Sequence, residues 1–107
     1  MANTTTISGS VIQIVPDGST DWDCQTDTPF KKVCVQSIQF NSSAVGDVCI
    51  VHDDTIDGPA LFRATAQVED GDYVKNYQPA IWCRPVIDAS DCTFGTPGNC
   101  SIMIYIV

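Results

Sequence analysis

The chain has 107 residues, of which 44% are hydrophobic and 17% are charged, so it is long enough for one packed domain and too apolar for a disordered tail. Five Lys and Arg residues stand against thirteen Asp and Glu residues, which gives a formal net charge of -8. This balance argues against nucleic-acid binding and against attraction to an anionic membrane, because both require clustered cations.

The kinds of apolar residue predict an all-β fold. The chain contains eleven Val and eleven Ile residues but one Leu, and twelve of its thirteen acidic residues are Asp. β-Branched side chains favour strands, whereas Asp favours turns. We therefore expect a single domain over residues 1–107, built as an antiparallel β-sandwich or a jelly-roll-like barrel of about seven or eight strands.

The N-terminal segment is polar and rich in Thr and Ser. It lacks the basic and apolar regions of a signal peptide, so we expect synthesis in a host cytoplasm. Residues 1–10 have the composition of an extended arm that lies along a neighbouring subunit. We therefore interpret part of this arm as contacts to a partner, namely Thr4, Thr5, Thr6 and Ile7.

The first half of the chain is expected to contain three strands. Residues 11–15 form the first, and a polar surface loop over 19–29 follows, anchored by Trp22. In the second strand, 33–40, the apolar residues switch from one face to the other, which predicts a β-bulge or burial of both faces. The third strand covers 48–51 and ends in an acidic turn.

The second half is expected to contain more strands, separated by turns rich in Gly, Pro and Asp. Pro85 indicates an edge or a break in pairing, because proline has no N–H to donate. The C-terminal strand is apolar on both faces, so it must be central in its sheet or covered by another subunit. The expected strands of this half cover 60–68, 73–75, 78–87, 90–94 and 101–107.

Six cysteines occur without any C-x-x-C spacing. Several of them, above all Cys49 and Cys83, have the sequence context of free thiols in the core. An oxidised protein would instead contain at least one disulfide. Two pairs of cysteines flank loops and are suited to face each other across a hairpin, Cys92 with Cys100 as the favoured pair and Cys24 with Cys34 as the other.

The sequence contains no motif of catalytic or cofactor chemistry. Its single histidine, His52, has no second His to help it bind zinc, and we interpret it as a solvated turn residue. The acidic loops 53–58 and 69–72 carry oxygen ligands of the kind that calcium prefers, but neither has EF-hand spacing, so we interpret them as solvated turns. We expect no enzyme activity, no metal and no cofactor.

The two tryptophans differ in their sequence context. Trp82 lies in an apolar segment, which favours a place in the core. Trp22 lies in a polar loop, which favours an exposed contact surface. We therefore expect Trp22, together with Phe30 at the end of the same loop, to contact a partner.

Several segments resemble a known group of proteins in their order along the chain and in their general composition. These segments are VQSIQFNS (35–42), GDV (46–48), GPALFRA (58–64) and PVIDASDCT (85–93). Over residues 30–107 the chain resembles the small all-β structural proteins encoded beside the capsid genes of tailed bacteriophages, most of all capsid decoration (cement) proteins. The six cysteines are a departure from that group.

The resemblance implies a component of the virion that binds the outside of the capsid shell, has no active site and often forms trimers. Its implied partners are the major capsid protein, another virion protein and further copies of itself. Two alternatives remain. One is a tail or head-fibre component of the virion, and the other is a secreted binding module stapled by disulfides, for example one that binds carbohydrate.

Overall fold

The computed structural model of the protein describes residues 3–107. Over this range the chain forms two antiparallel sheets that pack face to face, with one short α-helix and two 3-10 turns in the connections. The strands are β1 (Thr4–Ser8), β2 (Val11–Val15), β3 (Trp22–Asp23), β4 (Val33–Asn41), β5 (Val48–Asp53), β6 (Ala60–Thr65), β7 (Asp72–Cys83), β8 (Pro85–Ile87) and β9 (Ser101–Ile106). The helical turns are α1 (Cys24–Asp27), η1 (Ala89–Asp91) and η2 (Pro97–Asn99).

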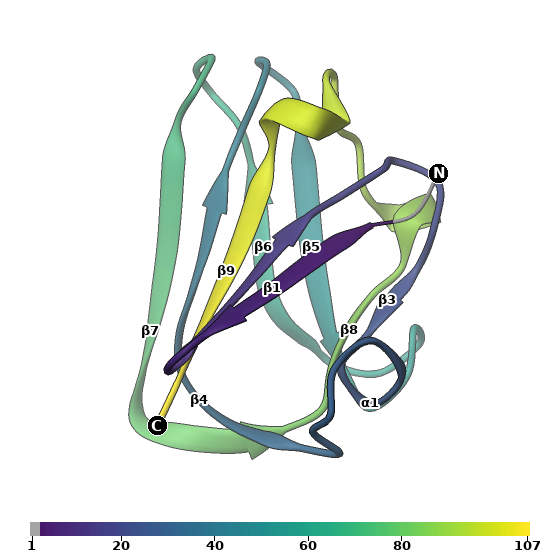
Figure 1. Ribbon diagram of the computed structural model, residues 1–107. Helices are drawn as coiled ribbons and strands as arrows, with labels where there is room; N and C mark the ends of the chain where they lie inside the picture. Colours follow the sequence, from purple (N-terminus) through teal and green to yellow (C-terminus); the bar gives the residue numbers. More distant parts are fainter. Residues whose placement is uncertain (1–2) are drawn as a thin grey trace.

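The strand order shows a β-sandwich rather than a closed barrel. One sheet has five strands in the order β1-β2-β9-β4-β7, and the other has four in the order β3-β8-β5-β6. In Figure 1 the five-stranded sheet lies in front of the four-stranded sheet. The predicted all-β class is therefore confirmed, and the strand number exceeds the expected one because the segments Thr4–Ser8 and Trp22–Asp23 also pair.

The core between the sheets is built from alternate residues of the strands. In β2 and β9 the isoleucines point inward, while the residues between them point outward. Ile106 is partly buried, and Ile12, Ile14, Ile102 and Ile104 are almost completely buried. Each such side chain contributes about 1.5–3 kcal/mol relative to an exposed position. β9 pairs with β2 on one side and with β4 on the other, so the C-terminal strand is central, one of the two positions expected for it.

The predicted irregularity in the strand over 33–40 is a β-bulge. Against β9, Val35 pairs with Ile106 and Ser37 with Tyr105, which makes Gln36 the extra residue on β4. Against β7 the register also shifts at this point, but there the extra residues, 77–80, lie on β7. As a result, Ile38 and Phe40 face the core together with Val35. The bulge accounts for the switch of faces in the sequence.

The chain passes from one sheet to the other at Arg84. β7 in the five-stranded sheet ends just before this residue, and β8 in the four-stranded sheet begins just after it with Pro85. The break expected at Pro85 is therefore confirmed. The separate strands expected over 73–75 and 78–87 are wrong in extent, because β7 is one long strand at the edge of its sheet.

Residues 4–8 form a strand rather than a free arm. β1 pairs with β2 along its whole length, from Thr4 opposite Val15 to Ser8 opposite Val11. Gly9 makes the turn between them with a φ of 59°, a left-handed conformation that glycine adopts without steric cost. The predicted arm is therefore wrong over this range, where Thr-rich sequence favours strand pairing. The first two residues of that arm lie outside the described residues.

Two connections differ from expectation because Asp side chains cap helical turns in them. The loop over 19–29 contains β3 and α1, and Asp23 accepts a hydrogen bond from the backbone N–H of Gln25 at 2.9 Å. The strand expected over 90–94 is not formed: its first two residues belong to the turn η1, also capped by an Asp, and only Thr93 forms an isolated bridge to β5. Such side-chain caps compete with strand pairing.

A buried carboxylate holds the loops at the start of β5. Asp47 is 1% exposed, and one of its oxygens accepts hydrogen bonds from the Ser43 N–H at 2.8 Å, the Ser43 hydroxyl at 2.7 Å and the Ala44 N–H at 3.0 Å. Its other oxygen accepts from the Gly95 N–H at 2.8 Å. Burial by itself raises the pKa of Asp47, but these hydrogen bonds outweigh it and lower the pKa to about 2.

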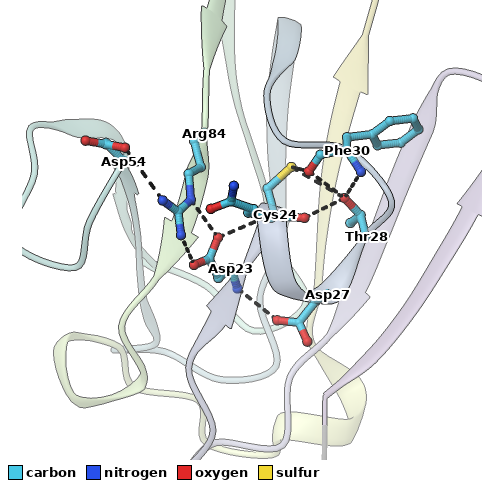
Figure 2. A network of polar contacts seen from close by, with 8 residues as sticks. Asp23, Cys24, Asp27, Thr28, Phe30, Asp54 and Arg84 are labelled. Carbon is cyan, nitrogen blue, oxygen red and sulfur yellow. Dashed lines mark hydrogen bonds and ion pairs between the residues drawn. The ribbon is translucent and has the colours of Figure 1, made fainter.

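An ion-pair network holds the opposite end of β5, where the chain changes sheets. The Arg84 guanidinium donates from Nε and Nη2 to the two carboxylate oxygens of Asp23 at 3.0 and 2.5 Å, and its Nη1 lies 3.8 Å from Asp54 Oδ1 (Figure 2). Asp53 accepts the backbone N–H of Arg84 at 3.0 Å. The hydrogen bonds to Arg84 are the main cause of a lowered pKa at Asp23.

Candidate interaction face

The outward side of the five-stranded sheet can be mapped from the register of its strands. Side chains alternate across a strand, so the residues between the buried ones point away from the core. A residue on one strand lies beside its pairing partner on the next, which arranges these outward residues in rows. The rows are Thr6–Gln13–Met103–Gln39–Val74, then Ser8–Val11–Tyr105–Ser37–Asn76, and a third with Thr4, Val15, Ser101, Asn41 and Asp72; together they are called the outer face.

The outer face is almost free of charge. Asp72, at the rim on β7, is its one charged residue, although the chain contains thirteen Asp and Glu and five Lys and Arg residues. Lys75 is also on β7, but it pairs with the buried Ile38 and so lies on the other side of the strand, with its Nζ 5.3 Å from the centre of the Tyr77 ring. Depletion of charge with Met and Tyr present is typical of the central part of a protein–protein interface.

The polar side chains of the outer face hold one another in place. The Gln39 amide donates to Asn41 Oδ1 at 2.9 Å, and the Asn41 amide donates to the Ser101 hydroxyl at 2.7 Å. The Tyr105 hydroxyl donates to Gln39 Oε1 at 3.3 Å. This network connects β4 with β9. Because these side chains are already ordered, less conformational entropy is lost when a partner binds them.

An exposed apolar corner adjoins the outer face at the C-terminus. Trp82 is 72% exposed and Val107 is 79% exposed. Both flank Cys34, because Trp82 pairs with Cys34 and the Val107 N–H donates to the Cys34 carbonyl oxygen at 2.9 Å. Figure 1 shows the C-terminus beside the bend of β7. We call these three residues the C-terminal corner, and an exposed Trp beside an uncharged surface is typical of the residues that dominate binding energy.

The predicted placement of the two tryptophans is wrong for both. Trp22 is 1% exposed, pairs with Ile87 in the four-stranded sheet, and donates from Nε1 to the Thr5 hydroxyl at 3.0 Å. Its polar neighbours in sequence lie at the surface, while strand β3 turns the ring into the core. Trp82 lies on an edge strand with its side chain on the outward side, where no described residue covers it.

The other predicted contacts are divided between the two sides of β1. Thr4 and Thr6 lie on the outer face, whereas Thr5 and Ile7 pair with the buried residues of β2 and point to the opposite side. Phe30 is half-buried and packs against the core. A partner contact at these positions stays a prediction, and for Thr4 and Thr6 the position on the outer face supports it.

The distribution of charge along the sequence indicates the outer face, although the predicted partner contacts do not depend on it. The segments 1–16, 33–43 and 101–107 contain no charged residue. They supply β1 and β2, β4, and β9, which are consecutive neighbours in the five-stranded sheet. The alternation of apolar residues shows which positions of each strand face outward, but only the pairing shows that these uncharged strands are adjacent.

His52 is buried rather than solvated, so its interpretation as an exposed turn residue is wrong. Its Nδ1 lies 2.8 Å from the Gly58 carbonyl oxygen and its Nε2 lies 3.2 Å from Asp91 Oδ2. The ring therefore ties the β5–β6 loop to η1. Across residues 3–107 there is no group of three or more His, Cys, Asp or Glu side chains placed to hold a metal ion, and this includes the acidic loops 53–58 and 69–72.

The expected disulfide between Cys92 and Cys100 is not formed in the structure, where all six cysteines are free thiols. The Cys100 thiol donates to a hydroxyl of the β4–β5 loop at 3.3 Å. The Cys92 sulfur lies instead against β5, where it accepts the Ile50 N–H at 3.5 Å. The interpretation of Cys49 and Cys83 as buried free thiols is confirmed.

A small cavity lies near the buried tryptophan, between the two sheets. Its volume is about 10 Å³, which is about enough for one water molecule. This space is too small for an organic ligand. Its lining includes Ile14, Pro16, Trp22, Ile87, Phe94 and Ile102.

Comparison with known proteins gives no relative for this chain. No protein-family model, curated protein or solved structure matches it. Within residues 3–107, no helix has both the length and the apolar character needed to cross a membrane. The interpretation of the outer face and the C-terminal corner therefore depends on their own geometry and chemistry.

Proposed function

We propose that the chain is a structural protein of a virus particle, which binds the outer surface of the capsid shell and stabilises it. In this proposal the outer face and the C-terminal corner make the contact. The observation that carries it is an uncharged, hydrogen-bonded sheet face beside an exposed Trp82, on a chain whose net charge is -8. The resemblance of residues 30–107 to phage decoration proteins supports the same function.

Electrostatics explains why such a protein would bind through an uncharged face. Copies on a capsid lie close together, and like charges of this size repel one another over about 10 Å at moderate ionic strength. Contact through the outer face places few of these charges at the interface, while the acidic remainder stays in solvent and keeps the protein soluble. On a lattice, many modest contacts add up through avidity.

The partner is the major capsid protein or another virion protein, with further copies of this chain as neighbours. We expect a trimer, which native mass spectrometry of the purified protein would measure. The particle itself gives the decisive test. Electron microscopy of particles that carry the encoding genome should show density for the chain at regular positions on the outside of the shell.

Copy number separates this function from the alternative of a tail or head-fibre component. Quantitative mass spectrometry of purified particles should give the chain in a fixed ratio to the major capsid protein, on the order of one copy per capsid subunit or per capsomer. A few copies per particle would indicate the tail or a fibre instead. Absence of the chain from the particles would rule out both virion functions.

A pair of charge substitutions tests the role of the outer face. Met103→Lys places a cation in the middle of the outer face, whereas Thr65→Lys adds the same charge at an exposed position of β6 in the other sheet. We expect Met103→Lys to weaken binding to stripped shells at least tenfold and Thr65→Lys to change it less than twofold, with circular dichroism confirming that both variants fold. Equal binding of the two variants would contradict the proposed contact.

The exposed ring of Trp82 favours carbohydrate as a second class of ligand, since a flat aromatic surface beside amides and hydroxyls suits a sugar. A secreted binding module would use the same surface for this purpose. Glycan-array binding by the wild-type chain that is lost in Trp82→Ala, without any binding to shells, would support this function in place of the structural one.

A further inference from the structure

We infer that Cys49 and Cys92 are placed to form a cross-strand disulfide between β5 and the segment that follows η1, and that a disulfide oxidant such as glutathione disulfide closes it. This inference does not depend on the proposed function, because it concerns the covalent chemistry of the fold itself. It also replaces the Cys92–Cys100 pair expected from the sequence.

The backbone pairing places the two cysteines opposite each other. The Val48 N–H donates to the Thr93 carbonyl oxygen at 2.8 Å, and the Thr93 N–H donates to the Val48 carbonyl oxygen at 2.9 Å. An antiparallel pair that exchanges both hydrogen bonds is followed by a pair that exchanges none, and here that next pair is Cys49 with Cys92. Non-hydrogen-bonded pairs have their Cα atoms about 4.5 Å apart, within the range that a disulfide spans.

The Cys92 side chain also lies against the strand that carries Cys49. The Cys92 sulfur lies 3.5 Å from the backbone nitrogen of Ile50, the residue after Cys49. The interaction between the two thiols raises the pKa of Cys49 and lowers the pKa of Cys92. Cys49 is 0% exposed, whereas Cys92 is half-buried and therefore more accessible to a reagent.

The other cysteines are held differently. Cys34 and Cys83 belong to neighbouring strands, but Cys34 points to the outer side of the sheet and Cys83 into the core, so they cannot bridge each other. The Cys24 sulfur lies 3.6 Å from the Thr28 hydroxyl, inside its own helical turn. By backbone register, Cys49 with Cys92 is the one pair of cysteines that lie opposite each other on neighbouring segments within residues 3–107.

The exchange reaction balances with the named oxidant. The Cys92 thiolate attacks one sulfur of glutathione disulfide, the sulfur–sulfur bond breaks, and one glutathione leaves as a thiolate that takes up a proton. The Cys49 sulfur then attacks the Cys92 sulfur of the mixed disulfide and releases the second glutathione. Overall, two protein thiols lose two electrons and two protons, and one glutathione disulfide is reduced to two glutathione molecules.

Peptide mapping of the oxidised full chain tests the inference. The protein is incubated with glutathione disulfide, its remaining thiols are alkylated, and it is cleaved without reduction after Lys and Arg and before Asp. These cuts place Cys49 in the peptide 47–52 and both Cys92 and Cys100 in the peptide 91–107. We expect a linked species of these two peptides, in which fragmentation shows Cys92 bonded and Cys100 alkylated.

Two single variants provide the matched controls. Cys100→Ala should keep the link and Cys92→Ala should abolish it, and the wild-type map alone decides the question if either variant fails to fold. Oxidation should raise the melting temperature of the wild-type protein by about 5 °C or more, because the link restricts the unfolded chain. A link between Cys92 and Cys100, or full alkylation of Cys49 after exposure to the oxidant, would overturn the inference.

Discussion

The two ends of strand β5 are held by polar networks of different kinds. At its start, the buried Asp47 carboxylate accepts hydrogen bonds from uncharged donors in the β4–β5 loop and before η2. At its end, Arg84 and Asp23 form a bidentate ion pair. Their side chains are 25% and 26% exposed. The first network therefore places one negative charge among dipoles, and the second pairs opposite charges near solvent.

The difference shows where the fold depends on single side chains. When a partner of this partly exposed ion pair is lost, water can replace it, so we expect the pair to contribute little to stability. When a buried acceptor is lost, its donors stay buried without a partner, and each one carries the full cost of its desolvation. We therefore expect the start of β5, at Asp47, to be far more sensitive to substitution than its end, beside Arg84 and Asp23.

The largest effect is expected for Asp47→Ala. The substitution leaves the Ser43, Ala44 and Gly95 N–H groups without their acceptor, and we expect it to lower the free energy of unfolding by about 3 kcal/mol. Urea denaturation followed by circular dichroism measures this loss. The control Asp57→Ala removes an exposed loop carboxylate and should change stability by less than about 0.5 kcal/mol. Equal losses in the two variants would contradict the importance of the buried carboxylate.

The pH dependence of stability should have one main source at the same residue; the pKa of Asp17 is also lowered to about 2, by hydrogen bonds from Thr20 and Ser19. The pKa of Asp47 is lowered from 3.8 to about 2, so its contribution is fully present above pH 3.8 and is lost as the pH falls through about 2. A shift of this size corresponds to about 2 kcal/mol at neutral pH. Urea denaturation between pH 5 and pH 2 measures it. The stability of Asp47→Asn should fall much less than that of the wild type over this interval, and parallel curves would show that other carboxyls dominate.

Much of the fold follows from local sequence pattern, and the reason is clear when the confirmed predictions are compared with the wrong ones. The composition predicts the class, the switch of apolar faces before Ile38 predicts the bulge, and Pro85 predicts the break between sheets. Each of these depends on neighbouring residues alone. The expected arm failed because pairing of Thr4–Ser8 depends on β2 and a glycine turn, and the expected strand over 90–94 failed because an Asp cap competes with it.

The candidate interaction face could be predicted only in small part. The sequence context of each tryptophan describes its neighbours along the chain, whereas exposure depends on the strand beside it and on which side the ring points. Trp22 is therefore buried in a polar loop, and Trp82 is exposed in an apolar strand. In the same way, the network between Asn41 and Ser101 joins residues far apart in the sequence, and only the sheet brings them together.

The smallest effect is expected at the end of β5, where Arg84 and Asp23 form their ion pair. Arg84→Met removes the guanidinium but keeps much of the apolar stem, and we expect it to destabilise the protein by about 1 kcal/mol. A double-mutant cycle with Asp23→Asn should give a coupling energy of about 0.5–1 kcal/mol that shrinks when the salt concentration is raised from 0.05 to 1 M, because the pair is accessible to ions. The loss in Asp47→Ala should change little over the same range, since its donors are uncharged and shielded from solvent. If the Arg84 coupling were insensitive to salt and as large as the Asp47 loss, the two ends of β5 would be stabilised alike, and the exposure of the side chains would not explain their energetics.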